Sequence, residues 1–240
     1  MFHDAQQARI AADNRAKRGG VDPAVYQPYI DALETSEKVV GRQLALCYRR
    51  VVPTEIRTWQ KTSRGLGEPL MARLIGHLGR PRIATPHHWE GTGSKRVLVA
   101  DEPYARTVSQ LWQYCGHGRP GRAQKGASAA DLAALGSPNL KMVTHLVAEC
   151  LVKAGVRQTT PGPKVPFTPT NRHAISPFGQ LYIDTRYATW DRVHTTECVR
   201  CGPSGKPAQP GAPWSGGHQQ GDALRKLGKE MLRQLWKAAA

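Results

Sequence analysis

The residues best suited to chemistry in this chain are two histidines and two cysteines near its C-terminal end. Cys198 and Cys201 are separated by two residues, His194 precedes them, and His218 follows the second cysteine after about sixteen residues. Thiolate and imidazole are preferred ligands of Zn²⁺, and a structural site takes four such ligands in a tetrahedron. The pattern therefore predicts a zinc site. Two interpretations compete with it: a redox pair without its usual βαβ context, and two unconnected thiols.

A second stretch, residues 52–79, has the composition of a phosphate-binding hairpin. Two short amphipathic helices are expected, one from Pro53 and one from Glu68, joined by a turn at Gly65 and Gly67. Glycine at both turn positions permits a positive φ and close approach of a phosphate, because no Cβ is in the way. Backbone N–H groups at the start of the second helix would hold the anion. The flanking cations are Lys61, Arg64 and Arg73. The alternative is an ordinary αα-hairpin whose glycines only turn the chain.

The charge balance favours a polyanionic partner. The 240 residues include 34 Lys and Arg against 18 Asp and Glu, a formal net charge of +16. Such an excess indicates nucleic acid or an anionic surface. No apolar run is long enough to span a membrane, and the N-terminus lacks the apolar core of a signal peptide. Five cysteines, an odd number, argue against a disulfide framework. We therefore expect a cytoplasmic DNA-binding protein that does not associate with membranes.

The elements that position these residues predict a mainly α fold, organised in four segments. Residues 1–51 form an N-terminal helical segment, and residues 52–155 hold the helix-hairpin-helix core with a small β-hairpin insert at 80–106. Residues 156–177 are a proline-rich linker or surface strap, and residues 178–240 are a C-terminal helical segment with the zinc-knuckle-like Cys-x-x-Cys loop. His87 and His88 would lie in one arm of the β-hairpin, as a solvent-exposed pair without acidic neighbours.

Apolar residues at helical spacing indicate which faces are buried. A helix beginning at Asp22-Pro23 has a short heptad seam, which would pack on the hairpin within one chain or pair two chains into a homo-oligomer. The seam consists of Leu33, Val40, Leu44, Cys47 and Val51. A later helix, led by Ser137-Pro138, has an apolar stripe that includes Cys150, which we expect in the core. The last helix has Leu224, Leu227, Met231 and Leu235 on one face.

A basic, glycine-rich segment at 116–126 separates two of these helices. It contains Arg119, Arg122 and Lys125 and no acidic residue. Such a segment is either a surface loop or a phosphate-binding loop that becomes ordered on DNA. Ser128 follows it and could cap a short helix with Asp131 at N3, a variant of the capping box.

The order of these motifs resembles the C-terminal half of the insertion-sequence one-ten family of transposases. The resemblance covers roughly residues 53–153: the Gly65-Leu-Gly67 hairpin, the segment 109–116 ending in Tyr-Cys-Gly, the basic glycine loop, and Gly136-Ser-Pro-Asn-Leu-Lys141 before an apolar helix. It implies that the chain is a stand-alone relative, from a mobile element or phage, that binds duplex DNA through its phosphates. It also implies that transposition or recombination, an RNA guide or a separate nuclease partner could be involved.

The chain also departs from the family pattern. The nuclease half with its metal-binding acids has no room here, and the insert at 80–106 has no counterpart. The family's catalytic serine lies in the loop after the Tyr-x-Gly segment, where this chain has none, so Ser128 is the nearest candidate nucleophile. Arg119, Arg122 and Lys125 would then stabilise the phosphate under attack. The rival classes are a recombinase, a non-catalytic DNA-binding module, and a basic RNA-associated protein.

Overall fold

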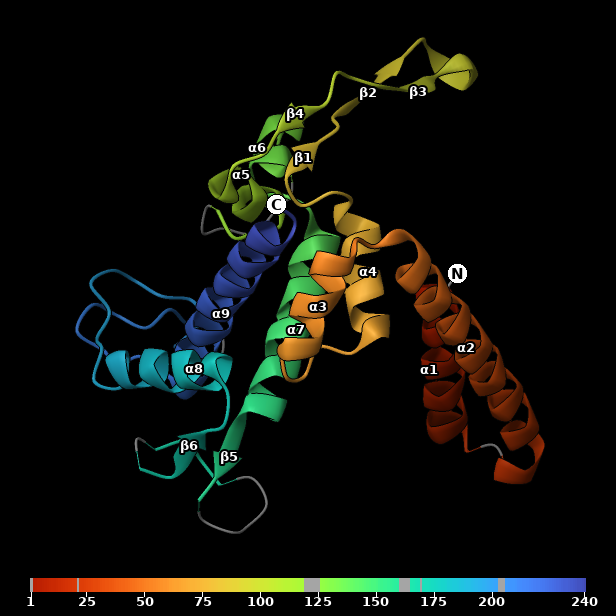
Figure 1. Cartoon of the computed structure of the whole chain (residues 1–240). Helices are drawn as coiled ribbons and strands as arrows, with labels where there is room; N and C mark the ends of the chain where they lie inside the picture. The colour runs from red at the N-terminus through yellow and green to blue at the C-terminus, as the bar shows by residue number, and fades with distance from the viewer. Residues whose placement is uncertain (1, 21, 119–125, 160–164, 169, 203–205) are drawn as a thin grey trace. The chain divides into compact units, whose positions relative to one another are not determined.

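The computed structural model describes residues 2–20, 22–118, 126–159, 165–168, 170–202 and 206–240 (Figure 1). The sequence-predicted phosphate contacts Arg119, Arg122 and Lys125 lie outside these described residues. The chain divides into two compact units. The first comprises residues 1–53 and 67–73, and the second comprises residues 54–66 and 74–240.

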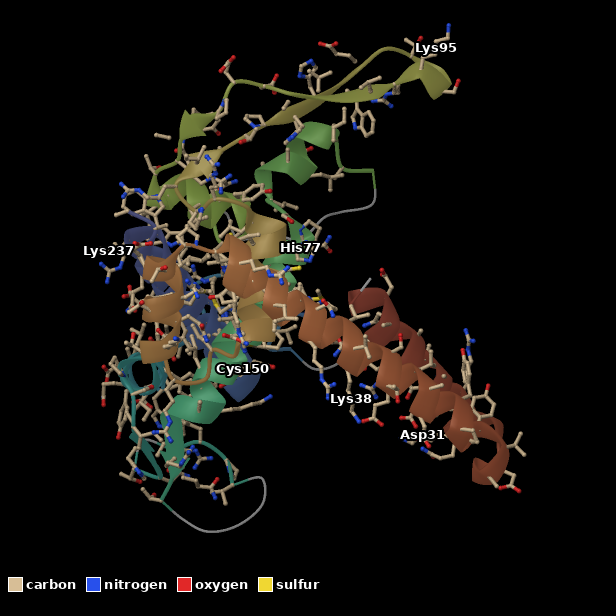
Figure 2. All side chains as sticks on the ribbon, turned by 45° about the vertical axis from the view of Figure 1, so that its right-hand side comes forward. Asp31, Lys38, His77, Lys95, Cys150 and Lys237 are labelled. Atoms are coloured by element: carbon tan, nitrogen blue, oxygen red, sulfur yellow. The ribbon has the colours of Figure 1, made fainter. Side chains whose placement is uncertain are left out.

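The first unit is built around two helices, α1 (Phe2–Gly19) and α2 (Pro23–Val51), which pack side by side (Figure 1). Asp22 caps α2 by accepting the Ala24 N–H, and Pro23 occupies the first turn, where its missing N–H costs nothing. An ion pair at 2.6 Å joins Arg9 of α1 to Glu37 of α2. Figure 2 shows Asp31 and Lys38 along α2.

The heptad seam predicted on α2 is only partly correct. Its residues Leu33, Val40 and Leu44 are half-buried, but Cys47 and Val51 are exposed. α1 packs along α2, a partner that the sequence did not predict, and Arg49 of α2 also forms an ion pair at 2.6 Å with Glu68 of α4, a residue of the predicted hairpin. At the C-terminal end of the helix, Tyr48 in the last turn and Val52 just past it are buried.

The predicted helical hairpin is present as α3 (Thr54–Thr62) and α4 (Glu68–Leu78). Between them Gly65 has a φ of +97°, as expected. The expectation of a positive φ at Gly67 is wrong, because that residue is not among those with left-handed backbone. The Gly67 carbonyl instead accepts a hydrogen bond from the Met71 N–H, as the carbonyl of a residue just before a helix does.

The second unit is a helical layer centred on α9 (Gly216–Ala238). This helix contacts α3, α5 (Val108–Tyr114), α7 (Pro138–Gly155) and α8 (Pro177–Ala188). Its four predicted apolar residues are all buried, which confirms the expected face: Leu224, Leu227, Met231 and Leu235. Serine side chains cap α7, α8 and α9 at their N-termini, and the short α6 (Ala129–Ala134) is capped in the same way. The sequence predicted Cys150 of α7 in the core, but this residue, labelled in Figure 2, is only half-buried.

Three small antiparallel pairs of strands, counted over the described residues, complete the second unit. β1 (Ile83–Ala84) pairs with β4 (Tyr104–Ala105), and β2 (His87–Glu90) pairs with β3 (Val97–Ala100). These form the predicted insert; the turn between β2 and β3 includes a short 3₁₀ segment, Gly93–Lys95 (Figure 2). The third pair, β5 (Val156–Gln158) with β6 (Arg172–Ala174), lies within the proline-rich segment, where no packed element was expected.

His88 of β2 differs from its prediction in one respect. It is exposed, as expected, but acidic neighbours accompany it: Asp101 at 2.7 Å and Glu90 at 3.0 Å. The hydrogen bond to Glu90, followed by that to Asp101, raises the pKa of the His88 imidazole.

Among the described helices, none combines the length and the apolar character that crossing a membrane requires.

Candidate metal centre

Four side chains in the connection between α8 and α9 converge on one point. His194, Cys198, Cys201 and His218 each place a ligand atom within 4.8 Å of the others. His194 is buried and the other three are half-buried. Over the residues that the structure describes, no other cluster of His, Cys, Asp and Glu has this form. The set is the one predicted from spacing, and it can hold a metal ion such as zinc.

The backbone of this connection holds the first two ligands in place. Two extended segments, 192–198 and 208–214, run antiparallel and exchange hydrogen bonds at both ends. The His194 N–H donates to Ala212 O at 2.9 Å, and Cys198 and Ala208 exchange two bonds of 2.9 Å. This irregular ribbon fixes the separation of His194 and Cys198 without regular strands.

A tight turn brings the second cysteine back beside the first. The Cys201 N–H donates to Cys198 O at 3.4 Å. Gly202 follows, and a Cβ there would lie 1.8 Å from Lys206 O. Only glycine fits, so the glycine after Cys201 is required by space rather than by a left-handed backbone.

The N-terminus of α9 supplies the fourth ligand and supports the third. Ser215 caps the helix by accepting the His218 N–H at 3.2 Å. The Ser215 hydroxyl also lies 3.2 Å from Cys201 Sγ, and the Ser215 N–H points to the same sulfur at 3.4 Å. Hydrogen bonds of this kind hold a ligating sulfur in a fixed orientation.

The ligand spacing agrees with one tetrahedral ion. His218 Nδ1 lies 3.2 Å from Cys201 Sγ and 3.6 Å from Cys198 Sγ. Zinc bond lengths of about 2.3 Å to sulfur and about 2.0–2.1 Å to nitrogen separate two ligands of a tetrahedron by about 3.6 Å. With four protein ligands the coordination sphere is closed, so the chemistry of such a site is structural and not hydrolytic.

The buried His194 adds an independent indication. Its Nε2 has no hydrogen-bond partner among the described residues, although the residue is only 6% exposed. Buried polar atoms are rarely left unpaired, and a metal ion would satisfy this one. Its ring faces the stacked rings of Trp214 and His218, which are 3.9 Å apart.

The electrostatic surroundings keep His218 neutral. Burial is the main cause that lowers the pKa of its imidazole, and Arg200 and His194 act in the same direction. A neutral imidazole has a lone pair available for a metal.

Ser215 and Trp214 are residues of this centre that the sequence analysis missed. The signal was present in the sequence Trp-Ser-Gly-Gly-His, where Ser215 stands three residues before His218 and so has the position of an N-cap. The stacking of Trp214 on His218 had no comparable signal.

The predicted hairpin contacts belong to other elements than this centre does. Lys61 and Arg64 are exposed, and Arg73 is half-buried on α4. A Cβ on Gly65 would lie 2.7 Å from Cys150 O and 2.8 Å from Ala154 Cβ of α7. Its open side is therefore occupied by a packed helix. At Gly67 a Cβ would meet only Pro69 Cδ at 3.8 Å, so this glycine is the one with free space beside it.

Ser128 occupies the cap position of α6. Its Oγ accepts the Asp131 N–H at 3.1 Å and donates to Asp131 Oδ2 at 2.7 Å. The bonds from Ser128 lower the pKa of the Asp131 carboxyl, which makes that group a weak base. In this arrangement the hydroxyl is engaged in helix capping, as one of the two interpretations of the sequence expected.

Comparison with protein-family models, with curated proteins and with solved structures finds no match to this chain.

Proposed function

We propose that this chain is a DNA-binding protein, related to the transposases that its motifs resemble, whose second unit is stabilised by one structural zinc ion. The observation that carries the proposal is a closed four-ligand group in a chain of net charge +16. The ligand group supports zinc as a structural element, and the charge supports a polyanionic partner.

The zinc part of the proposal follows from the donor set. Two thiols and two imidazoles are the ligands of small structural zinc sites, and softer or harder metals prefer other sets. The ion would join the start of α9 to the ribbon that follows α8. That connection contains few buried apolar residues, so the metal would supply the cohesion that a hydrophobic core supplies elsewhere.

The DNA part of the proposal is supported by exposed cations at the helical hairpin. Lys61 and Arg64 lie at the end of α3 and in the turn after it, and both are exposed. Gly67, which opens α4, has free space around its Cα. Contacts from such groups go to phosphates and are independent of base sequence.

The described part of the chain favours a binding role over strand transfer. Ser128, the candidate nucleophile, has its hydroxyl in a capping box, and the adjacent Asp131 is a poor base. As the resemblance implies, the protein would then bind DNA while a separate nuclease partner cuts it.

Metal analysis together with a DNA titration tests this function. Protein purified without an affinity tag should contain one zinc per chain, and Cys198→Ser should contain none. Binding of a labelled duplex should weaken with salt at a slope of log K against log salt of about −0.9 per phosphate contacted.

A paired variant tests the hairpin in the same titration. Lys61→Gln with Arg64→Gln should lower the steepness of the salt dependence by about one unit for each lost phosphate contact. Lys17→Gln with Lys38→Gln, exposed cations of α1 and α2, is the matched control. The proposal would be contradicted by equal zinc content in wild type and Cys198→Ser, or by a duplex affinity that does not change with salt concentration.

A further inference from the structure

A cleft beside the metal centre is lined by cations from three separate segments. Its volume is about 730 Å³, within the range of ligand-binding cavities. Lys141 and His145 of α7, Arg200 of the cysteine turn and Arg225 of α9 line it. None of these residues belongs to the helical hairpin, so the cleft is distinct from the contacts proposed above.

The acidic groups of the cleft are already engaged. Asp222 forms ion pairs with Arg225 at 2.9 Å and with Lys226 at 3.2 Å. Glu197 accepts a hydrogen bond from the Gln209 amide at 3.3 Å. By contrast, Lys141 and Arg200 are exposed and form no salt bridge with any acidic side chain in the part of the chain that the structure describes.

One buried residue of the cleft lining, His117, lies near several of these cations. The buried His117 has its imidazole pKa lowered to about 4, first by burial and then by Lys141, Lys229 and Arg225. Like charges that act together on one buried group indicate that they converge. The lining contains the cations Lys141, Arg200 and Arg225 against the carboxylates of Glu197 and Asp222, so it has an excess of positive charge supplied by three segments.

We propose that this cleft holds a backbone phosphate of bound nucleic acid, and that the metal centre positions Arg200 for that contact. Arg200 stands between Cys198 and Cys201, in the turn closed by the Cys201 N–H and Cys198 O. A metal that joins both thiols fixes this turn, and with it the direction from which Arg200 approaches the cleft. Lys141 and Arg225, from two packed helices, complete the set of donors. The inference rests on the proposed function, because it names the group that a DNA-binding protein would hold here.

Glycine on α9 leaves the cleft open. Gly221 lines the cleft, and a Cβ built on it meets nothing within 4 Å. A larger side chain at this position would extend into the space where the phosphate would lie, without changing any charge.

Duplex titration of charge and steric variants tests the inference. Lys141→Gln and Arg200→Gln should each bind the duplex about tenfold more weakly and reduce the steepness of the salt dependence by about one. Gly221→Leu should also bind about tenfold more weakly, through steric exclusion alone. Each variant should retain one zinc per chain, which shows that the centre is intact.

Matched controls make the result specific. Lys153→Gln removes the same charge from the same helix α7 outside the cleft, and Gly216→Leu changes a glycine of α9 that is equally open and does not line the cleft. Both should bind as wild type does. If the cleft variants keep zinc and bind like these controls, the cleft is not a phosphate site, and the proposed function still stands. If wild type binds no duplex, the proposed function fails and the inference fails with it.

Discussion

At the scale of single residues, burial decides what a titratable group can do. His117 is 7% exposed, and its Nε2 lies 2.7 Å from the Thr144 hydroxyl. That hydroxyl donates to the backbone carbonyls of Leu140 and Lys141. Nε2 of His117 therefore carries the hydrogen and donates it to the Thr144 oxygen. The imidazole is held neutral, as a hydrogen-bonded core group with cations around it.

The His117 imidazole makes the stability of the protein depend on pH. Its pKa is about 4 in the folded state and about 6.5 in the unfolded chain. Between these values the unfolded chain binds the extra proton, so stability is complete above pH 6.5 and decreases as pH falls towards 4. The loss is about 1.4 kcal/mol per pH unit, or up to about 3 kcal/mol in all.

Denaturant unfolding at pH 7.5 and at pH 5 tests this dependence. His117→Gln keeps a donor for Thr144 and removes the titration, so it should lose less stability than wild type between the two values. Acid would also release a metal held by the four candidate ligands, but that loss would be common to both proteins and would cancel in their difference. His77→Gln, which changes an exposed histidine of α4, should behave as wild type does. Parallel curves for wild type and His117→Gln would exclude this role.

At the scale of elements, the two glycines of the helical hairpin have different reasons to be glycine. Gly65 has a φ of +97° and packs against the α7 backbone, whereas Gly67 has neither constraint. Gly65→Ala should therefore lower the free energy of unfolding by about 2–4 kcal/mol, from strain and from the clash with Cys150 O. Gly67→Ala should stay within about 0.5 kcal/mol of wild type. Thermal unfolding of both variants measures the contrast, and equal effects would show that α7 does not lie where the structure places it.

These elements also show how far sequence alone could reach. Helix starts were readable because Asp22-Pro23 and Ser137-Pro138 satisfy local hydrogen bonds, and the metal ligands were readable because their spacing is local. The packing of Gly65 on α7 was not readable, since its partner lies 85 residues away in the chain. The convergence of Lys141, Arg200 and Arg225 on one cleft likewise depends on tertiary packing. The β5–β6 pair was not predicted, because the proline-rich composition of residues 156–177 gives no signal for the short strands near the two ends of that segment.

At the scale of the whole molecule, the tryptophans distinguish the two units. The first unit contains no tryptophan, and all six of the chain belong to the second. They are Trp59, Trp89, Trp112, Trp190, Trp214 and Trp236. Tryptophan fluorescence therefore reports on the second unit alone, while far-ultraviolet circular dichroism also follows α1 and α2. Trp214, stacked on His218, reports on the metal centre itself.

This separation leads to a prediction for metal removal. A ligand that binds only the folded state stabilises it by about 2.7 kcal/mol at a hundredfold excess over its dissociation constant. For a unit of this size, that corresponds to roughly 5–10 °C in melting temperature. A chelator should therefore lower the melting temperature seen by tryptophan fluorescence by about this amount and change the emission of Trp214. The helical signal of α1 and α2 should melt unchanged, because that unit contains none of the four ligands.

The control for metal removal is Cys198→Ser, which should melt at the chelated temperature with or without chelator. Trp214→Phe should keep the shift in melting temperature but lose the emission change that precedes melting. Identical fluorescence melts of wild type with and without chelator would show that the four side chains hold no metal in solution. A chelator that shifts the α1–α2 melt equally would show instead that the two units unfold as one, since metal bound in one unit can stabilise the other only through cooperative unfolding.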